Sequence, residues 1–106
     1  MARVIIMNVN EASNLFKILG DENRLKIVKI LVNTGEVCAC KFLNCVDCGQ
    51  STLSFHLQIL KDNGIVSCRR SGKMMLYSAN NKLLKELMDF LYKPCDKFKK
   101  ELFSCE

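Results

Sequence analysis

The spacing of hydrophobic residues predicts two helices at the start of the chain. Residues 9–19 have apolar side chains at every third or fourth position, as in an amphipathic helix, and Gly20 follows where such a helix would end. Asp21 stands where the capping residue of a second helix is expected, and a broad apolar face then continues to Thr34-Gly35. The first third of the chain is therefore predicted to form two helices.

Two further helices are predicted in the middle of the chain. A short one is expected over residues 37–47. A longer one is expected over residues 50–63, because Asn63-Gly64 is a typical helix end and Ser51 or Thr52 can cap the start. Gly49 would join the two directly.

The longer of these helices has two contrasting faces. Leu53, Leu57 and Leu60 form one apolar stripe, which we expect to be buried. The opposite face carries mainly short hydrogen-bonding groups instead of the Lys and Glu that usually coat a solvated helix. Such a face is suited to reading the edges of DNA bases. Its residues are Gln50, Ser51, Thr52, Ser54, Phe55 and Gln58.

The rest of the chain predicts a hairpin and a final helix. Residues 65–70 and 74–79 are strand-like runs around Ser71-Gly72, which favours a tight turn. Residues 83–91 then carry a wide apolar face, and Pro94 interrupts the helix that this face predicts. Three basic residues lie near the hairpin tip and could reach a phosphate backbone: Arg69, Arg70 and Lys73.

This order of elements is typical of a winged helix-turn-helix protein, in which the hairpin is the wing. We predict a mainly α fold with a small β-hairpin and five or more helices, with residues 1–106 forming a single domain. A domain of this size buries only about two thirds of the surface of its unfolded chain, so a homodimer would help to stabilise it.

Composition agrees with a globular protein. The chain is 49% hydrophobic and 25% charged, and no apolar run approaches the roughly 18 residues of a membrane span. The opening MARVIIMNVNEA lacks the long apolar centre of a secretory signal, so we expect a cytoplasmic location and no membrane partner. A net charge of +5 is compatible with a polyanionic partner, although it is also ordinary for a soluble protein.

The densest chemistry in the chain is the run CACKFLNCVDC at residues 38–48, which holds four of the seven cysteines. A zinc cage, a disulfide and a chemical sensor all use thiols at this density. The odd number of cysteines and a reducing compartment argue against a disulfide. On a straight helix Cys38 and Cys45 would stand about 10 Å apart, too far to share one ion, so a four-cysteine zinc cage would require a loop.

The individual cysteines are predicted to differ. Cys38 and Cys40 would lie at a helix start, where the exposed N–H groups favour the thiolate that binds metal or reacts. Cys45 and Cys48, three residues apart, could share a soft ion but not an unstrained disulfide, and each could instead pack as a small hydrophobe. Cys68, in the first hairpin strand, is expected in the core.

The only histidine, His56, has two readings. It could pack beneath the hairpin or face DNA from the 50–63 helix. A Cys-His nucleophile would need this histidine near a thiol and a pocket, and nothing in the sequence points to one. We therefore predict that the protein is not an enzyme.

Four segments together resemble the ArsR/SmtB family of prokaryotic metal-, metalloid- and thiol-responsive repressors. They are LGDENRLKIVKIL, EVCACKF, STLSFHLQILKDNGIV and RRSGKMMLYS, and the resemblance extends from about Ala12 to Leu91. It implies a homodimer that pairs through residues 8–20 and 81–105 and binds double-stranded operator DNA. The DNA contacts would come from Gln50, Ser51, Thr52, Ser54, Phe55, His56, Gln58, Arg69, Arg70 and Lys73.

The resemblance also implies a role for the first two clustered cysteines. The family counterpart of EVCACKF, typically ELCVCDL, supplies thiolates to arsenite, antimonite, cadmium or lead, and Cys38 and Cys40 fall on its two cysteine positions. Arsenite-responding members commonly have a third cysteine where this chain has Leu43. A third thiolate could instead come from Cys45, Cys48, Cys95 or Cys105. The zinc or cobalt site that other members build with histidine on the final helix is absent, because residues 83–92 contain no histidine.

The resulting hypothesis is a repressor that leaves its operator when these thiolates bind As(III), Sb(III) or a soft divalent ion such as Cd, Pb or Zn, with no organic cofactor. Two alternatives stay open. One is a redox or persulfide sensor that links a cysteine of residues 38–48 to Cys95 or Cys105. The other is a structural interaction module that holds zinc permanently, which a chelator would unfold.

Overall fold

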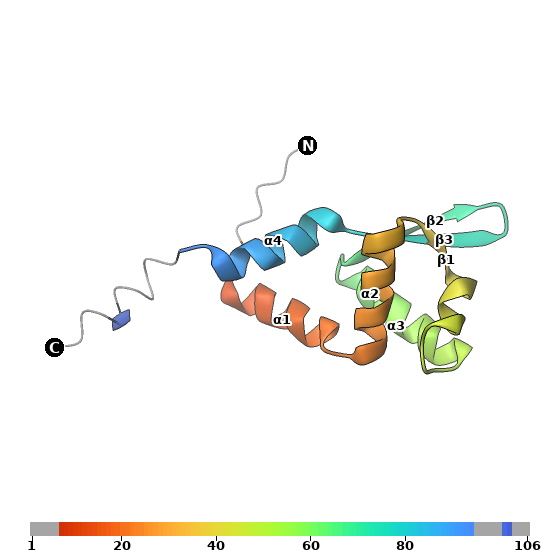
Figure 1. Cartoon of the computed structure of the whole chain (residues 1–106), viewed down its shortest axis with the longest axis horizontal. Coiled ribbons are helices and arrows are strands. Elements are labelled where there is room, and N and C mark those ends of the chain that lie inside the picture. The colour runs from red at the N-terminus through yellow and green to blue at the C-terminus, as the bar shows by residue number, and fades with distance from the viewer. Residues whose placement is uncertain (1–6, 95–100, 103–106) are drawn as a thin grey trace.

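The structure is a computed structural model that describes residues 7–94 and 101–102. Residues 7–94 form five helical segments and a three-stranded antiparallel sheet, so the predicted winged helix-turn-helix class is confirmed (Figure 1). In chain order the elements are α1 (Val9–Leu19), α2 (Glu22–Thr34), β1 (Val37–Cys38), the 3₁₀ helix η1 (Ala39–Asn44), α3 (Gln50–Asp62), β2 (Val66–Ser71), β3 (Met74–Ala79) and α4 (Asn81–Tyr92).

Side-chain caps fix the starts of three helices. The carboxylate of Asp21 accepts a hydrogen bond of 3.1 Å from the backbone N–H of Arg24, as predicted for α2. Asn8 and Asn80 cap α1 and α4 in the same way. Helix α3 differs, because its N-cap is Gly49 and no side chain caps it. The prediction that Ser51 or Thr52 caps this helix is therefore wrong.

The predicted helix over residues 37–47 is also wrong. Val37 and Cys38 instead form β1, which pairs with β3 and adds a third strand to the wing. A 3₁₀ helix follows, and residues 45–48 form turns and bends. The reason is a tertiary contact: Gly35, at φ 86°, turns the chain after α2 and lets a β-branched residue pair with the open edge of β3.

The hairpin itself agrees with the prediction within one residue. The strand order is β1-β3-β2, so β3 lies in the centre of the sheet. The last cross-strand pair is Ser71 with Met74, and Gly72 at φ 62° takes the turn conformation that a residue with a side chain rarely adopts.

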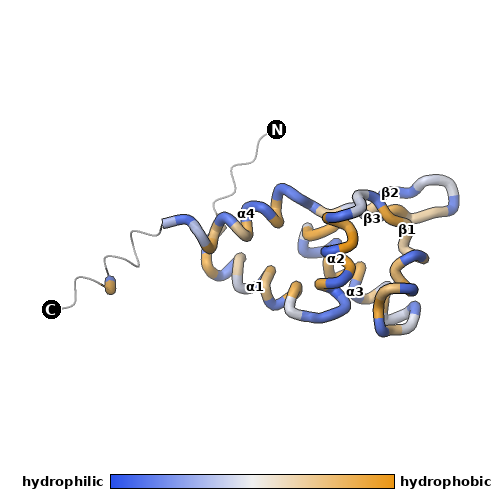
Figure 2. The backbone as a smooth tube through the Cα atoms, viewed as in Figure 1, coloured by the Kyte–Doolittle hydropathy of each residue, from blue (hydrophilic) through white to orange (hydrophobic). Residues whose placement is uncertain are grey.

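The core is built by one face of each helix together with the base of the wing. Its largest fully buried side chains are Phe42, Ile27, Leu31, Leu60, Ile65 and Leu87. The predicted stripe of Leu53, Leu57 and Leu60 on α3 is buried. Helices α1 and α4 lie side by side at one end of the molecule, and η1 and the wing lie at the other (Figure 1). Hydrophobic and hydrophilic positions alternate along both α1 and α4 (Figure 2).

No helix among the described residues is both long and apolar enough to cross a membrane.

Candidate DNA-binding surface and thiol site

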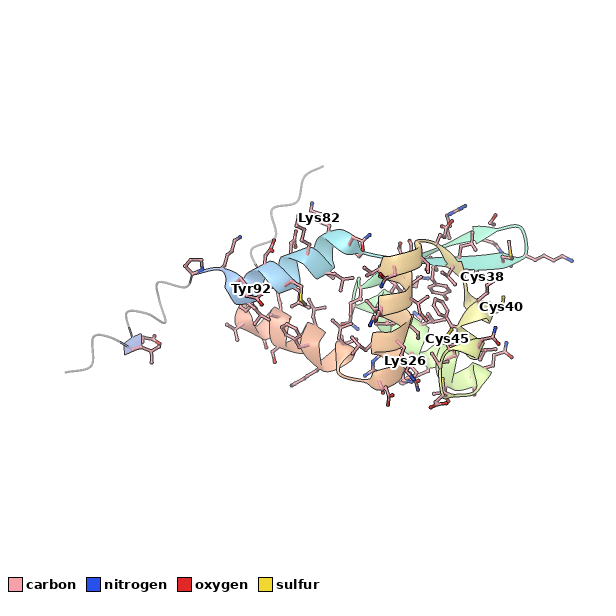
Figure 3. All side chains as sticks on the ribbon, in the orientation of Figure 1. Lys26, Cys38, Cys40, Cys45, Lys82 and Tyr92 are labelled. Atoms are coloured by element: carbon pink, nitrogen blue, oxygen red, sulfur yellow. The ribbon has the colours of Figure 1, made fainter. Side chains whose placement is uncertain are left out.

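Cys38 and Cys40 form a close pair of thiols. Their Sγ atoms lie 3.1 Å apart where the chain passes from β1 into η1 (Figure 3). Cys40 is exposed and Cys38 is half-buried, so a small ligand can reach both. Two sulfurs that bind one ion must lie within roughly 4 Å of each other, and this pair meets that requirement without a helix.

The two thiols differ in acidity. The hydrogen bond from Cys40 lowers the pKa of the Cys38 thiol, and the backbone N–H of Cys40 and the charge of Lys41 lower it further. The same hydrogen bond raises the pKa of Cys40, because its proton is held between the sulfurs. Cys38 is therefore the first of the pair to become the thiolate that binds a soft ion.

This difference predicts the order of thiol reaction. Replacing Cys40 by alanine removes the main cause of the lowered pKa at Cys38, so we expect Cys38 to react more slowly with iodoacetamide near neutral pH and its pH profile to move upward. Peptide mass spectrometry of the reduced proteins measures the rates. Cys45 is the internal control, because its rate should be equal in both proteins. An unchanged rate at Cys38 would show that the pair does not control its acidity.

Cys45 and Cys48 do not join this pair in a larger cluster. Among residues 7–94 and 101–102, no three His, Cys, Asp or Glu side chains come together in a way that could hold a metal ion. The helical spacing that would have paired Cys45 with Cys48 is absent because residues 45–48 are not helical. Cys45 lies instead against α2, beside Lys26 (Figure 3).

The remaining cysteines give no third ligand within the described chain. Cys68 is half-buried on β2, opposite Tyr77. The predicted alternatives Cys95 and Cys105 lie outside the described residues.

Helix α3 presents a continuous polar surface. The six predicted base-reading residues of this face are all exposed, and 60% of the Phe55 surface is accessible. The amide of Gln58 donates a 2.7 Å hydrogen bond to Asp62 one turn later, which orients it along the helix. We call this surface the α3 face; it consists of Gln50, Ser51, Thr52, Ser54, Phe55 and Gln58.

His56 is not part of the α3 face, which contradicts its assignment to the DNA contacts. The residue is buried, with 7% of its surface exposed, and Nδ1 lies 3.2 Å from the Arg24 guanidinium. Nε2 lies 3.9 Å from Asp21, whose pKa is lowered chiefly by a hydrogen bond from the backbone N–H of Arg24. The signal was in the sequence, since residue 56 falls between Leu53 and Leu57 on the buried stripe.

The three basic residues of the wing are placed differently. Arg70 and Lys73 are exposed near the hairpin tip. Arg69 is held by Glu36, to which its Nε and one terminal nitrogen donate hydrogen bonds of 2.6 and 2.7 Å. These bonds lower the pKa of the Glu36 carboxyl, which favours its ionised form. The pairing of Glu36 with Arg69 was not predicted, because nothing in the local sequence around Glu36 indicates a partner on β2.

Comparison with known proteins agrees with this geometry. Residues 21–67, from the α2 cap into β2, match the family described as bacterial regulatory protein, arsR family. The arsenical resistance operon repressor of Staphylococcus aureus is 38% identical over 85 residues, which are 80% of this chain and 81% of that one. The chain belongs to the ArsR family. Its members are regulatory proteins, which confirms the prediction that the chain is not an enzyme.

This ArsR-family chain is also similar to a cadmium regulator and to a repressor of known structure. The cadmium resistance transcriptional regulatory protein CadC of Listeria innocua is 44% identical over 77 residues, or 73% of this chain; the match spans 65% of the CadC length. The crystal structure of the transcriptional repressor BigR from Xylella fastidiosa superposes with a TM-score of 0.66, at 36% identity over 78% of this chain and 84% of that one.

Proposed function

We propose that this ArsR-family chain is an operator-binding repressor that leaves DNA when Cys38 and Cys40 bind a soft thiophilic ion. The observation that carries the proposal is the pair of sulfurs 3.1 Å apart, in the segment of the chain that leads into α3. Its similarity to repressors named for arsenical and cadmium resistance supports the same reading.

The donor chemistry favours arsenite, antimonite, Cd(II) or Pb(II), with Zn(II) as a weaker candidate. Thiolates are soft ligands that select such ions over Mg²⁺ or Ca²⁺. Cys38 and Cys40 would supply two of the ligands, and the remaining positions would be filled by another thiolate or by water. An ion held by both thiolates would restrain the end of β1 relative to the start of η1.

The DNA contacts are proposed to divide between two surfaces. The α3 face would enter the major groove, where its short polar groups can reach base edges. Arg70 and Lys73 of the wing would hold backbone phosphates, which position the protein without reading sequence. The net charge of +5 agrees with such a partner.

This division predicts two distinct mutant phenotypes. Arg70→Ala should weaken binding equally on all DNA sequences and reduce the slope of log affinity against log salt by about one unit. Thr52→Ala should change the preference among operator variants and leave the salt slope unchanged. Fluorescence anisotropy at several salt concentrations measures both quantities. Equal loss on every sequence for Thr52→Ala would remove Thr52 from base recognition.

The dimer is proposed to form through α1 and α4. These helices pack together and leave several large apolar side chains exposed on one end of the chain. They are Val9, Phe16, Met88, Leu91 and Tyr92. A second copy that covers this surface would place two α3 faces about 34 to 36 Å apart, one turn of DNA.

A charge placed on this surface tests the dimer. Leu91 is 61% exposed, so Leu91→Glu should leave the fold of each chain intact but convert the dimer to a monomer, because a carboxylate would be buried at the interface. Leu25→Glu, at a residue of α2 that is 52% exposed, is the matched control and should remain dimeric. Light scattering after size-exclusion chromatography measures the mass. Dimeric Leu91→Glu would place the interface elsewhere.

Ligand binding is proposed to act on DNA through the chain between the thiols and α3. The backbone N–H of Asp47 donates a 3.1 Å hydrogen bond to Asn23, which fixes this linking segment to the start of α2. An ion that rearranges η1 would have to shift this segment, which leads into α3, and the resulting change in the direction of α3 would make the ion bind the free protein better than the DNA complex. Such coupling typically changes DNA affinity by about 5- to 150-fold, and DNA must weaken ion binding by the same factor.

A further inference from the structure

The thiol site and the wing are parts of one sheet. Cys38 is the last residue of β1 and lies opposite Leu76 of β3. Arg69 of β2 lies opposite the same Leu76 on the other side. One row of residues therefore crosses the three strands: Cys38, Leu76 and Arg69. A shift of the Cys38 thiol would thus start in the same sheet that carries the basic residues of the wing.

Arg69 ties the two outer strands together across the central one. Its guanidinium reaches from β2 past β3 to Glu36, the residue just before β1, and makes two hydrogen bonds of 2.6 and 2.7 Å. A bidentate guanidinium–carboxylate pair fixes both distance and orientation. We call this pair the Glu36–Arg69 clamp.

The clamp matters because β1 is a short strand at the edge of the sheet, held by its pairing with β3 and by the packing of Val37 against the core. This strand is two residues long, and it makes two cross-strand pairs with β3: Val37 lies opposite Tyr77, and Cys38 lies opposite Leu76. Without the clamp, so short an edge strand could separate from β3 when its thiol is drawn onto an ion. With the clamp, a displacement of β1 would be carried to Arg69 on β2 and to the adjacent Arg70.

We propose that the Glu36–Arg69 clamp transmits ion binding at Cys38 and Cys40 to the wing, which withdraws Arg70 and Lys73 from the DNA backbone. This inference rests on the proposed function and adds a second route to the one through α3. It assigns Glu36 and Arg69 as positioning residues of the switch. It also gives Arg69, which pairs with Glu36, a different role from Arg70 and Lys73 near the hairpin tip.

The route through the wing has its own signature. Each phosphate contact that is lost lowers the salt slope by about one unit, whereas re-aiming α3 alone changes affinity with less effect on that slope. In the wild-type protein, Cd(II) should therefore lower both the DNA affinity and the salt slope. A purely structural ion pair would affect stability without linking Cd(II) to the slope.

Glu36→Gln is the test variant, because it keeps the shape of the side chain and removes the charge that holds Arg69. Anisotropy on a fragment of the protein's own promoter, with and without Cd(II) and over a range of salt, gives affinity and slope. We expect DNA affinity without Cd(II) to stay close to that of wild type, because Glu36 is not among the proposed DNA contacts and an exposed ion pair contributes little to the stability of the fold. The loss caused by Cd(II) should shrink by about threefold or more within the usual range of coupling, and Cd(II) should no longer change the salt slope.

Two further variants complete the design. Glu22→Gln removes the carboxylate of another exposed pair, with Lys26 at 3.6 Å on α2, and should respond to Cd(II) as wild type does. The reversed pair, Glu36→Arg with Arg69→Glu, should restore the effect of Cd(II) on the slope. Cd(II) can also be titrated into each protein in the absence of DNA, and binding can be followed by the thiolate-to-cadmium charge-transfer absorption. This titration should give the same Cd(II) affinity for the wild-type and Glu36→Gln proteins.

The outcomes separate the clamp from the proposed function. A Glu36→Gln protein that responds to Cd(II) like wild type would overturn the inference and leave the proposed repressor standing. A Glu22→Gln protein with the same defect would show a general charge effect, which also overturns it. A wild-type protein whose DNA affinity ignores Cd(II), arsenite and Pb(II) would overturn the proposed function, and the inference with it.

Discussion

Replacing Cys38 and Cys40 together by serine is expected to abolish the release of operator DNA by soft ions. A serine hydroxyl is a hard, neutral ligand at physiological pH, so the double variant loses both donors while the side chains keep nearly the same shape. Since both residues are solvent-accessible, DNA binding without ions should stay close to wild type. The expected loss of affinity on adding arsenite or Cd(II), about 5- to 150-fold in wild type, should fall to none.

The control for this result is a single change at a thiol outside the cluster. Cys68→Ser alters a half-buried thiol on β2 and should keep the full response to ions. Circular dichroism of each protein shows whether it is folded. If the Cys38→Ser, Cys40→Ser protein still released DNA with ions under reducing conditions, the sensing thiols would have to be others in the chain.

The second large effect is expected at Phe42, the residue that anchors η1 beneath the thiols. Its side chain is only 1% exposed, and its carbonyl accepts hydrogen bonds from the backbone N–H groups of Cys45 and Val46. Phe42→Ala should therefore lower the free energy of unfolding by about 3 to 5 kcal/mol, the usual cost of removing a buried aromatic ring. Urea denaturation of the reduced protein at a fixed concentration measures this loss.

The neighbouring residue Leu43 gives a matched control. It belongs to the same 3₁₀ helix but is 37% exposed, so Leu43→Ala should cost less than about 1 kcal/mol. Similar losses at both positions would mean that η1 is not anchored by the phenyl ring. The contrast also bears on function, because an unanchored η1 could not carry movement of the thiols to α3.

Local sequence was sufficient where an element is stabilised by its own apolar face and caps. Helix α2 begins beside the predicted cap Asp21, and α3 buries the predicted leucine stripe. Residues 37–47 were predicted as helix because short apolar runs do not distinguish helix from strand. What decided this segment was pairing of Val37 with Tyr77, a contact between residues far apart in the chain.

In the candidate site, too, features set by local sequence were predicted and features set by long-range contacts were not. The sequence singled out Cys38 and Cys40, but spacing by one residue does not bring two side chains together on a helix. Their sulfurs lie 3.1 Å apart because the chain passes from β1 into η1 between them. His56 was placed on the DNA side by its position in a polar segment, but its helical phase puts it in the core beside Arg24. The partnership of Glu36 with Arg69 depends on strand register, which the local pattern does not reveal.

The central claim is that soft ions at the Cys38 and Cys40 thiols release the protein from DNA. The most direct test is fluorescence anisotropy of the reduced protein on its promoter fragment, titrated in parallel with arsenite, Cd(II), Pb(II), Zn(II) and a mild thiol oxidant. The account predicts that DNA affinity falls by about 5- to 150-fold with arsenite or a soft cation while reductant is present. Release by the oxidant alone would contradict it and favour a redox switch, and no release by any of them would assign these thiols to the scaffold.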